Sequence, residues 1–558
     1  MIRRALAVVI VLIAVSVASA KNLYVNNSGA PACSENTTYA NNTAALPWCS
    51  IGRALWGNAV KTSANSAQAA TAGDVVLVTP GLYSAGTGSS WGTAPSLYPI
   101  NSGTLSNPIT IRKNGVGVFE VRIAAGTSGS FLGTCGSLEQ SNCGAGRGDY
   151  QHPSDYIIWD GVYVDQTSVP TAGASGGVIT FWGCLGCQLL NSEVKGDNIG
   201  SQGINHAGVY MQYNSGMVVR NNYIHDLRMP SGGNAEGILI YDTSDTLFEH
   251  NLLQNNGSGI YPKGAVLGVQ DNLTIRFNWF VGNEEGMEFS YHPSGNPGQD
   301  LIYQNVFDCT GGGVGIYFWG DLQKVRFVNN TLYNCNTALT SVRHVGDPVV
   351  WVSMLWRNNI LQSVSDHSAF SFGTVDAGVD VSAFDGDYDL AYNFTDEFGS
   401  LYGVGYPSKA SWVAQTGDET NTLTSNPLLV NPSGGDFRIC RGNGNPTVAC
   451  TTASPAINSG RDILDLNANG STTDTITMGA YITGTEIIGI DTNCGNGTIE
   501  EPEQCDGANL NSHTCAEFGC SGGTPTCASC TITQTGCTGC GATTGKVRGA
   551  KVRGVKVR

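Results

Sequence analysis

The sequence is poor in charged residues, and it is poorest in basic ones. Only 13% of its 558 residues are charged, and 28 Lys and Arg face 44 Asp and Glu, which gives a formal net charge of −16. Two arginines near the start and six basic residues in the last 13 are included in that figure, so the rest of the chain carries about −24. General electrostatic attraction to nucleic acid is therefore excluded.

Long apolar runs are also absent, with one exception at the N-terminus. Arg3 and Arg4 precede an apolar run from Ala5 to Val17, and Ala18-Ser19-Ala20 supplies the small residues of a cleavage site. This pattern predicts a signal peptide over residues 1–20 and hence a secreted or cell-surface protein. No later stretch approaches the 18 residues that a membrane span needs, so we expect no membrane span.

Helical periodicity is scarce over most of the chain, whereas glycine and asparagine are abundant. An asparagine returns at intervals of 29, 27, 27, 25 and 28 residues, and each is preceded by a glycine that opens a run of alternating apolar residues. Strands with a repeat of 25 to 30 residues indicate a solenoid in which one residue type stacks as a ladder. The ladder predicted from this spacing comprises Asn222, Asn251, Asn278, Asn305, Asn330 and Asn358.

The alternation after each glycine also predicts the core. The first and third residues after each glycine should face inward. A short amphipathic stretch from Ser50 to about Val60 predicts a helix that covers the open end of the stack. The predicted inward positions are Val209, Met211, Ile238, Ile240, Ile260, Met287, Phe289, Ile316 and Phe318.

Motifs at both ends of the repeat resemble those of known β-helix proteins. GDVVLVTPGLY (73–83) and SGTLSNPITIR (102–112) lie near the start, and NPLLV (426–430), SPAINSG (454–460) and MGAY (478–481) lie near the end. Residues 21–485 thus resemble the right-handed parallel β-helix of pectate-lyase-like proteins, which implies an all-β fold. The expected order is a cap with the first coils (21–85), the β-helix (86–485), a cysteine-rich module (486–540) and a disordered basic tail (541–558).

Eighteen cysteines in an exported chain favour disulfides over metal sites. Cys184 and Cys187 form a CxxC in a turn, which favours a structural bridge or a free pair over redox chemistry. Eight cysteines within 494–540 resemble a cysteine-rich repeat of myxobacterial surface proteins, and a four-thiolate zinc site is the alternative. Neighbouring positions predict the pairs Cys33–Cys49, Cys135–Cys143, Cys309–Cys335 and Cys440–Cys450.

Outward positions along the repeat gather aromatic and polar side chains, which is what a polysaccharide-binding groove requires. Structural stacking of the aromatic rings is the alternative. Lys263 follows Pro262, which cannot donate to a strand ladder, so the backbone is expected to bend or bulge there. The predicted substrate-binding residues are Tyr210, Tyr241, Tyr261, Tyr317, Trp319 and Arg343, and the predicted catalytic residues are Lys263, Glu288, Asp242 and His292.

Three functions compete for this groove. The resemblance implies a polysaccharide lyase in which Lys263 removes a proton from an acidic sugar by β-elimination, with calcium as a possible cofactor. A glycoside hydrolase would use Asp242 and Glu288, two coils apart and thus separated by about 9.6 Å. A non-enzymatic surface protein that binds glycans is the third. We expect a monomer in each case. The sequence favours the lyase and leaves the other two open.

Overall fold

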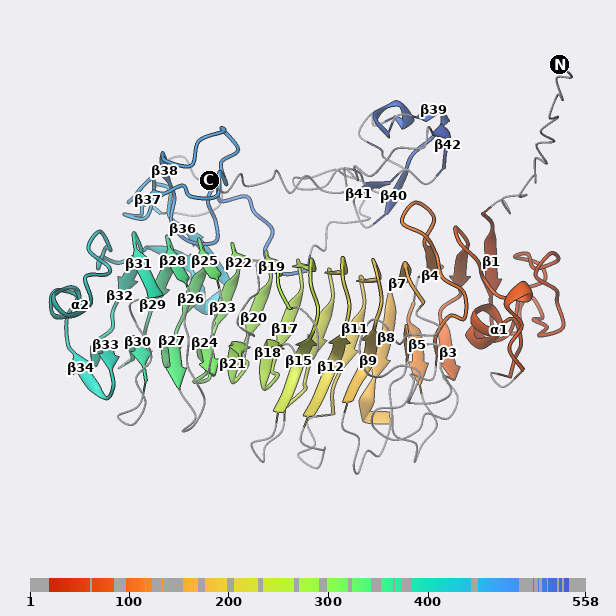
Figure 1. Cartoon of the computed structure of the whole chain (residues 1–558), viewed down its shortest axis with the longest axis horizontal. Helices are drawn as coiled ribbons and strands as arrows, with labels where there is room; N and C mark the ends of the chain where they lie inside the picture. Colours follow the sequence, from red (N-terminus) through yellow and green to blue (C-terminus); the bar gives the residue numbers. More distant parts are fainter. Residues whose placement is uncertain are drawn as a thin grey trace, which may run out of the picture.

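The computed structural model describes residues 20–60, 63–84, 97–115, 117–122, 132–134, 154–168, 176–197, 205–228, 234–264, 270–290, 299–319, 324–342, 353–364, 367–373, 383–442 and 450–490, and parts of 505–540. Its main body is a stack of coils in which three strands per coil build three long parallel sheets (Figure 1). The predicted all-β parallel β-helix is confirmed.

The first sheet pairs each strand in parallel with the corresponding strand of the next coil. Its strands are β1 (Asn22–Val25), β2 (Val75–Val78), β4 (Ile109–Lys113), β7 (Ile157–Asp160), β10 (Gln188–Leu190), β13 (Val218–Arg220), β16 (Leu247–Glu249), β19 (Thr274–Arg276), β22 (Asp300–Tyr303), β25 (Val325–Val328), β28 (Met354–Arg357) and β31 (Phe384–Asp387).

The second sheet follows the first after a tight corner. Its strands are β3 (Gly81–Ser84), β5 (Phe119–Arg122), β8 (Val162–Asp165), β11 (Glu193–Lys195), β14 (Tyr223–His225), β17 (Leu252–Gln254), β20 (Trp279–Val281), β23 (Val306–Asp308), β26 (Thr331–Tyr333), β29 (Ile360–Gln362) and β32 (Leu390–Tyr392).

The third sheet carries the longest strands and ends in an antiparallel pair, β33 and β34. Its strands are β6 (Leu132–Gly133), β9 (Gly176–Trp182), β12 (Asn205–Gln212), β15 (Asn234–Tyr241), β18 (Ser258–Gly264), β21 (Glu285–Phe289), β24 (Val314–Trp319), β27 (Thr337–Val342), β30 (Ser368–Phe372), β33 (Glu397–Leu401) and β34 (Val404–Tyr406).

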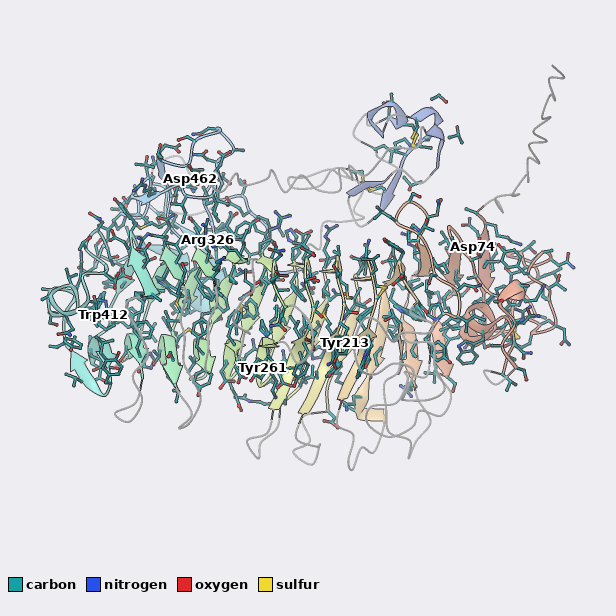
Figure 2. The ribbon with its side chains drawn as sticks, in the orientation of Figure 1. Asp74, Tyr213, Tyr261, Arg326, Trp412 and Asp462 are labelled. Atoms are coloured by element: carbon teal, nitrogen blue, oxygen red, sulfur yellow. A yellow bond between two sulfur atoms is a disulfide. The ribbon has the colours of Figure 1, made fainter. Side chains whose placement is uncertain are left out.

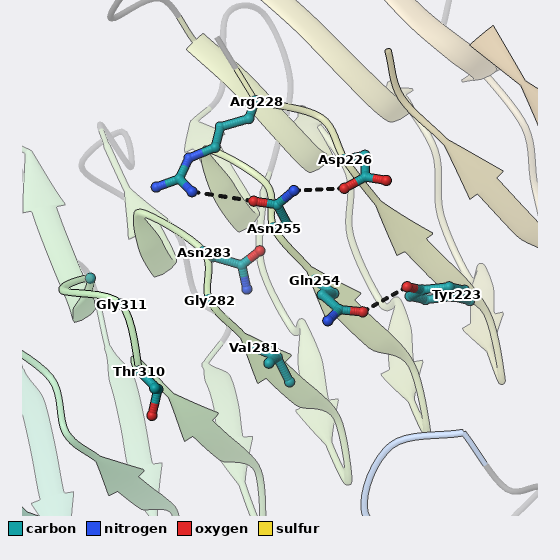
Figure 3. Close-up of a pocket in the computed structure, with 11 residues that line it drawn as sticks. Tyr223, Asp226, Arg228, Gln254, Asn255, Val281, Gly282, Asn283, Thr310 and Gly311 are labelled. Carbon is teal, nitrogen blue, oxygen red and sulfur yellow. Dashed lines mark hydrogen bonds between the residues drawn. The ribbon is translucent and has the colours of Figure 1, made fainter. Parts of the chain in front are cut away.

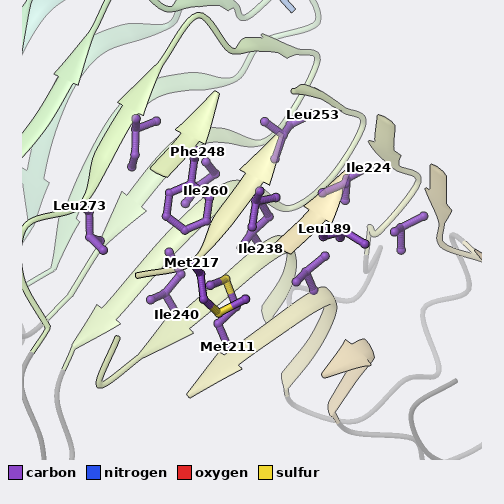
Figure 4. Close-up of a cluster of buried hydrophobic side chains, with 14 of the residues drawn as sticks. Leu189, Met211, Met217, Ile224, Ile238, Ile240, Phe248, Leu253, Ile260 and Leu273 are labelled. Carbon is purple, nitrogen blue, oxygen red and sulfur yellow. The ribbon is translucent and has the colours of Figure 1, made fainter. Parts of the chain in front are cut away.

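One continuous apolar core runs between the three sheets (Figure 4). All nine predicted inward residues are buried in it, each with 1% exposure or less, so the predicted inward alternation is confirmed. The core fills with side chains that repeat from coil to coil, as in the stacked rings of Phe280 and Phe307, whose centroids lie 4.5 Å apart. Such burial is the main stabilising term of a fold whose coils contact only their neighbours.

Helices lie at both ends of the stack (Figure 1). The predicted N-terminal helix is confirmed as α1 (Ile51–Trp56), which begins at Ser50, whose hydroxyl accepts from the Arg53 N–H. The helix at the other end, α2 (Lys409–Thr416), was not predicted. Its Trp412 (Figure 2) is fully buried and stacks on Phe370 with ring centroids 5.4 Å apart.

The asparagine ladder occupies the corner between the first and second sheets. Asn278 is typical: its Nδ2 donates to Asn305 Oδ1 at 3.0 Å, while its Oδ1 accepts from Asn251 N and Nδ2. The ladder is confirmed from Asn222 to Asn330, but the choice of Asn358 is wrong. Asn330 donates to Asn359, because Asn358 takes the left-handed turn conformation (φ 58°) immediately before the ladder position.

The segment after the last coil folds back along the second sheet. Phe437 packs on Trp279 and Tyr333, and Gly489 N–H donates to Phe277 O. This segment therefore covers the second sheet from β20 toward its C-terminal end. It contains β35 (Leu429–Asn431), β36 (Asp436–Ile439), β37 (Gly460–Arg461) and β38 (Thr475–Ile476).

Three of the four predicted disulfides lie in the described residues, and two are confirmed. Cys33–Cys49 and Cys309–Cys335 are bonded, the latter across adjacent coils with Cα atoms 4.6 Å apart. The Cys440–Cys450 prediction is wrong: both are free thiols, and burial together with the neighbouring Cys450 raises the pKa of Cys440 to about 11. Cys135 and Cys143 lie outside the described residues.

The CxxC and the C-terminal module are also cross-linked. Cys184 is bonded to Cys187, as the structural interpretation expects. In the module, Cys505–Cys527 and Cys515–Cys537 are bonded, which contradicts a zinc site built on Cys527 and Cys537. The module contains β39 (Cys520–Gly523), β40 (Thr526–Ala528), β41 (Thr531–Thr533) and β42 (Cys537–Cys540).

Short 3-10 helices complete the secondary structure: η2 (Ser66–Gln68), η4 (Gln166–Ser168), η6 (Pro432–Gly434) and η7 (Cys515–Phe518). Within the described residues, none of the helices has the length and apolar character that crossing a membrane requires.

Candidate active site

The outer face of the third sheet carries an aromatic patch on β12, β15 and β18. Tyr210, Tyr241 and Tyr261 surround Leu239 there, and the Tyr210 and Tyr241 rings lie 5.8 Å apart. Trp182 extends the row, stacked on Tyr210 with centroids 5.9 Å apart. Tyr261 is buried, with 4% exposure, whereas Trp182, Tyr210 and Tyr241 are half-buried and offer flat apolar faces on which sugar rings can stack.

The strand β18 bulges where proline interrupts it. Ile240 lies opposite Pro262, but Tyr241 lies opposite Gly264, so Lys263 is the extra residue of a β-bulge. The predicted bend is confirmed, and its cause is the missing N–H of Pro262. Tyr241 and Lys263 are each the fourth residue after a glycine, so a regular repeat would place them side by side, but the bulge shifts the register by one residue.

The bulge places Lys263 above the ring of Tyr261. Its Nζ lies 5.3 Å from the ring centroid, within cation–π range. The Tyr261 hydroxyl donates to Ser290 Oγ (3.0 Å), and Ser290 in turn donates to the Lys263 carbonyl (2.8 Å). These contacts fix the lysine, the phenol and the serine relative to one another.

Two glutamates, Glu285 and Glu288, lie near the hydroxyl of Ser258, which is on the same strand as Lys263. Ser258 Oγ lies 2.7 Å from Glu288 Oε2 and 3.3 Å from Glu285 Oε2. The two carboxyl oxygens are therefore at most 6.0 Å apart, the sum of these distances. Because a hydroxyl has one proton, it donates to one carboxylate at a time and can accept from the other only when that carboxyl is protonated.

A third glutamate, Glu236, was missed by the sequence reasoning. It lies opposite Ser258 in the register and is completely buried, and neither of its carboxyl oxygens has a hydrogen-bond partner among the described residues. Burial and the charge of Glu288 raise its pKa well above the ordinary value. The signal in the sequence was the column just before each glycine, which contains Ala207, Glu236, Ser258, Glu285 and Val314.

Burial also raises the pKa of the other two glutamates of the cluster, Glu285 and Glu288. Burial raises the pKa of Glu288, against the opposing effects of Ser258, Tyr261 and Lys263. Burial and the Glu288 charge raise the pKa of Glu285 to about 7, and Glu285 is the more exposed of the two. At neutral pH, Glu285 is therefore about half protonated.

Other predicted site residues lie at the edge of this cluster or outside it. Tyr317 lies opposite Glu288 in the register, and the Glu288 charge together with burial raises the Tyr317 pKa. Asp242 lies in the turn after β15, where its charge adds to the effect of burial in raising the pKa of Tyr213. The structure thus gathers Glu236 and Glu285, rather than Asp242, around Glu288. His292, Arg343 and the side chain of Trp319 lie outside the described residues.

The described carboxylates do not fit a calcium site. In the part of the chain that the structure describes, no group of three or more His, Cys, Asp or Glu side chains is arranged to hold a metal ion. The positive charge of Lys263 opposes the rise in pKa that burial causes at both Glu236 and Glu288.

Comparison with known proteins identifies the architecture. The family model described as "Right handed beta helix region" matches residues 157–332, which confirms the predicted handedness. No curated protein matches.

Among solved structures, the chain is similar to the pectate lyase Pel9A (16% identity, 83% of this chain and 96% of that chain, TM-score 0.40). It is also similar to a rhamnogalacturonan lyase (14%, 72% and 99%, TM-score 0.42). A third is the GH136 lacto-N-biosidase from Eubacterium ramulus (12%, 68% and 61%, TM-score 0.37).

Proposed function

We propose that this protein is a carbohydrate-active enzyme that hydrolyses glycosidic bonds of an extracellular polysaccharide, with the reaction taking place on the outer face of the third sheet. The observation that carries the proposal is the pair of glutamates, Glu285 and Glu288, held by one serine hydroxyl beside a row of tyrosines. The described cluster contains three carboxyl groups and one lysine, so it suits a neutral sugar better than a uronate, whose carboxylate would be repelled.

The two glutamates differ in the way that acid–base catalysis requires. Glu285, with a pKa of about 7, supplies a proton to the leaving oxygen of the glycosidic bond. Glu288 would be the ionised partner: burial raises its pKa, but the Ser258 hydroxyl, Tyr261 and the Lys263 charge oppose that rise. A separation of at most 6.0 Å between their oxygens is closer to the roughly 5–5.5 Å of retaining enzymes than to the spacing of inverting ones. Glu288 would then attack the anomeric carbon as the leaving group departs, and water would later release the sugar.

A second candidate is β-elimination of an acidic polysaccharide, which the sequence favours. The observation that supports it is Lys263 against Tyr261, a possible base beside a possible acid. In that reaction the site must also hold the carboxylate of the sugar, whereas the described cluster already contains the carboxyl groups of Glu236, Glu285 and Glu288. The proposed site of action is outside the cell, on the basis of residues 1–20 and the disulfides Cys33–Cys49 and Cys309–Cys335.

One assay separates the candidates. Neutral and uronate polysaccharides are incubated with the protein, and the products are scored for new reducing ends and for the ultraviolet absorbance of unsaturated uronides. Hydrolysis gives reducing ends without absorbance, β-elimination gives both, and a glycan-binding protein gives neither. Activity on the neutral glycans should fall as the pH rises through about 7, because Glu285 must be protonated.

Variants assign the roles. Glu285→Gln and Glu288→Gln should each lower kcat by about 10²-fold or more. The matched control is Glu397→Gln, since Glu397 also contacts a serine (Ser368, 3.2 Å) on the same face but away from the cluster. Loss of activity with Lys263→Ala alone, accompanied by ultraviolet-absorbing products in the parent, would refute the hydrolase and support the lyase.

A further inference from the structure

A pocket of about 470 Å³ lies on the second sheet, around the corner from the glutamates. It opens between the ends of β14, β17 and β20 and the turn after β23 (Figure 3). The segment that folds back over the second sheet reaches Trp279 on β20, so the pocket lies where that cover ends. It is lined by Tyr223, Asp226, Arg228, Gln254, Asn255, Val281, Gly282, Asn283, Thr310, Gly311 and Gly313.

The charges around this pocket are paired. Arg228 contacts Glu284 through Nε (3.0 Å) and donates to Asn255 Oδ1 (3.2 Å), and Asn255 Nδ2 donates to Asp226 Oδ1 (2.6 Å). This row of Glu284, Arg228, Asn255 and Asp226 therefore presents neither an isolated cation that would attract an anionic ligand nor an isolated anion. Its planar amide and guanidinium groups lie side by side instead, an arrangement that suits the neighbouring hydroxyls of a sugar ring.

The inner side of the pocket offers a donor and an apolar surface. The Tyr223 hydroxyl donates to Gln254 Oε1 at 2.6 Å, and this bond orients the Gln254 amide. Among the described residues, no group accepts a hydrogen bond from Gln254 Nε2, so that donor remains for a ligand. The side chain of Val281, on the outer face of β20, supplies apolar surface beside it.

The far wall is a glycine turn held by a disulfide. Cys309 precedes Thr310 and the three glycines, and its bond to Cys335 ties the turn to the next coil. Gly311 has a φ of 116°, and a side chain placed there would meet no atom within 4 Å, so the turn leaves open space. The disulfide thus anchors a wall that consists of Thr310 and glycines and leaves open space at Gly311.

We propose that this pocket is a second glycan-binding site, which takes a short stretch of neutral polysaccharide through its hydroxyl groups. Its volume lies in the range of small-ligand pockets and accommodates a short oligosaccharide. The site is distinct from the glutamate cluster, and a chain bound at both would cross the edge where the second and third sheets meet. At that edge Arg228, whose charge lowers the pKa of Glu285, is the link between them.

The test is oligosaccharide binding, measured by titration calorimetry and by saturation-transfer NMR. The protein carries Glu285→Gln and Glu288→Gln so that no probe is consumed. The probes are xylo-, gluco-, galacto- and manno-oligosaccharides, with oligogalacturonate as the acidic contrast. Gln254→Ala and Val281→Trp, one removing the donor and one filling the pocket, should each weaken binding of the preferred neutral probe by about tenfold or more.

The matched control is Gln188→Ala, which changes the same residue type on an outer strand position of the first sheet. Unchanged binding in both pocket variants, or a preference for oligogalacturonate, would overturn the proposal, as would failure of every neutral probe to bind. If Val281→Trp lowers the melting temperature, its loss of binding is not informative, and Gln254→Ala alone then tests the proposal. The outcome is independent of turnover: absence of cleavage by the parent protein would refute the hydrolase and leave this binding site intact.

Discussion

The asparagine ladder allows a stability prediction to be worked out bond by bond. Asn278→Ala removes an acceptor from Asn251 N–H and Nδ2 and a donor from the Phe248 carbonyl, at a position with no solvent exposure. Asn251 Nδ2 retains its bond to Val219 O, but Asn251 N–H is left unsatisfied. One fully orphaned donor and one weakened carbonyl, at about 1–3 kcal/mol for each buried group, give a loss of roughly 2–4 kcal/mol.

Equilibrium unfolding in denaturant measures this loss. The control is Asn272→Gly, because Asn272 holds an exposed bond to Asp245 and a φ of 55° that glycine adopts without strain. Alanine at position 272 would add a left-handed backbone cost of about 1–2 kcal/mol and confuse the comparison. Equal midpoints for Asn278→Ala and the parent would refute the reasoning, since they would mean that the ladder bonds add nothing to stability.

Three further predictions concern the ends and cross-links of the rod. Burial raises the pKa of Glu419 to about 8 from 4.5, so the folded state holds a proton that the unfolded chain releases. The contribution of Glu419 to the free energy of unfolding is therefore greatest below about pH 4.5 and is lost as the pH rises through about 8, and Glu419→Gln should flatten that slope in pH-dependent thermal melts. Trp412→Ala should cost about 3–5 kcal/mol by uncovering Phe370 and Phe398, and a melting temperature equal to that of the parent would show that α2 does not close the core. Cys309→Ser should cost about 3 kcal/mol, because the bond closes a loop with a sequence separation of 26, and peptide mapping that finds both thiols free in the parent would contradict the bond itself.

The fold could be predicted because every coil repeats the same demands. Glycine, apolar alternation and a corner asparagine recur in register, so several independent signals agree on one architecture. The error at Asn358 has a local cause. Asparagine pairs occur at the corners, and the first residue of each pair takes the left-handed turn while the second joins the ladder, as Asn329 and Asn330 also do. Both places favour asparagine, so composition alone does not separate them.

The Cys440–Cys450 pair and the candidate site were harder to predict, because both depend on a local geometry that spacing along the chain does not determine. Cys440 and Cys450 are ten residues apart, but proximity along the chain does not set the geometry that a disulfide needs. Lys263 was recognised because proline is a strong local signal. The register shift that follows from the bulge depends on the pairing with β15, which only the stacked coils reveal.

Glu236 was not predicted from the sequence because the regular alternation of inward and outward side chains along a strand fails at the glycines. A side chain at Gly259 would lie 2.5 Å from the Phe280 ring, and one at Gly286 would lie 2.5 Å from Phe307, so the glycines face the core. The residue after each glycine faces the core as well, and the residue before it therefore points outward. That reversal is what brings Glu236 and Glu285 to the same face as Glu288 and Tyr261. A glycine selected for close packing inside the rod thus also determines which carboxylates meet on its surface.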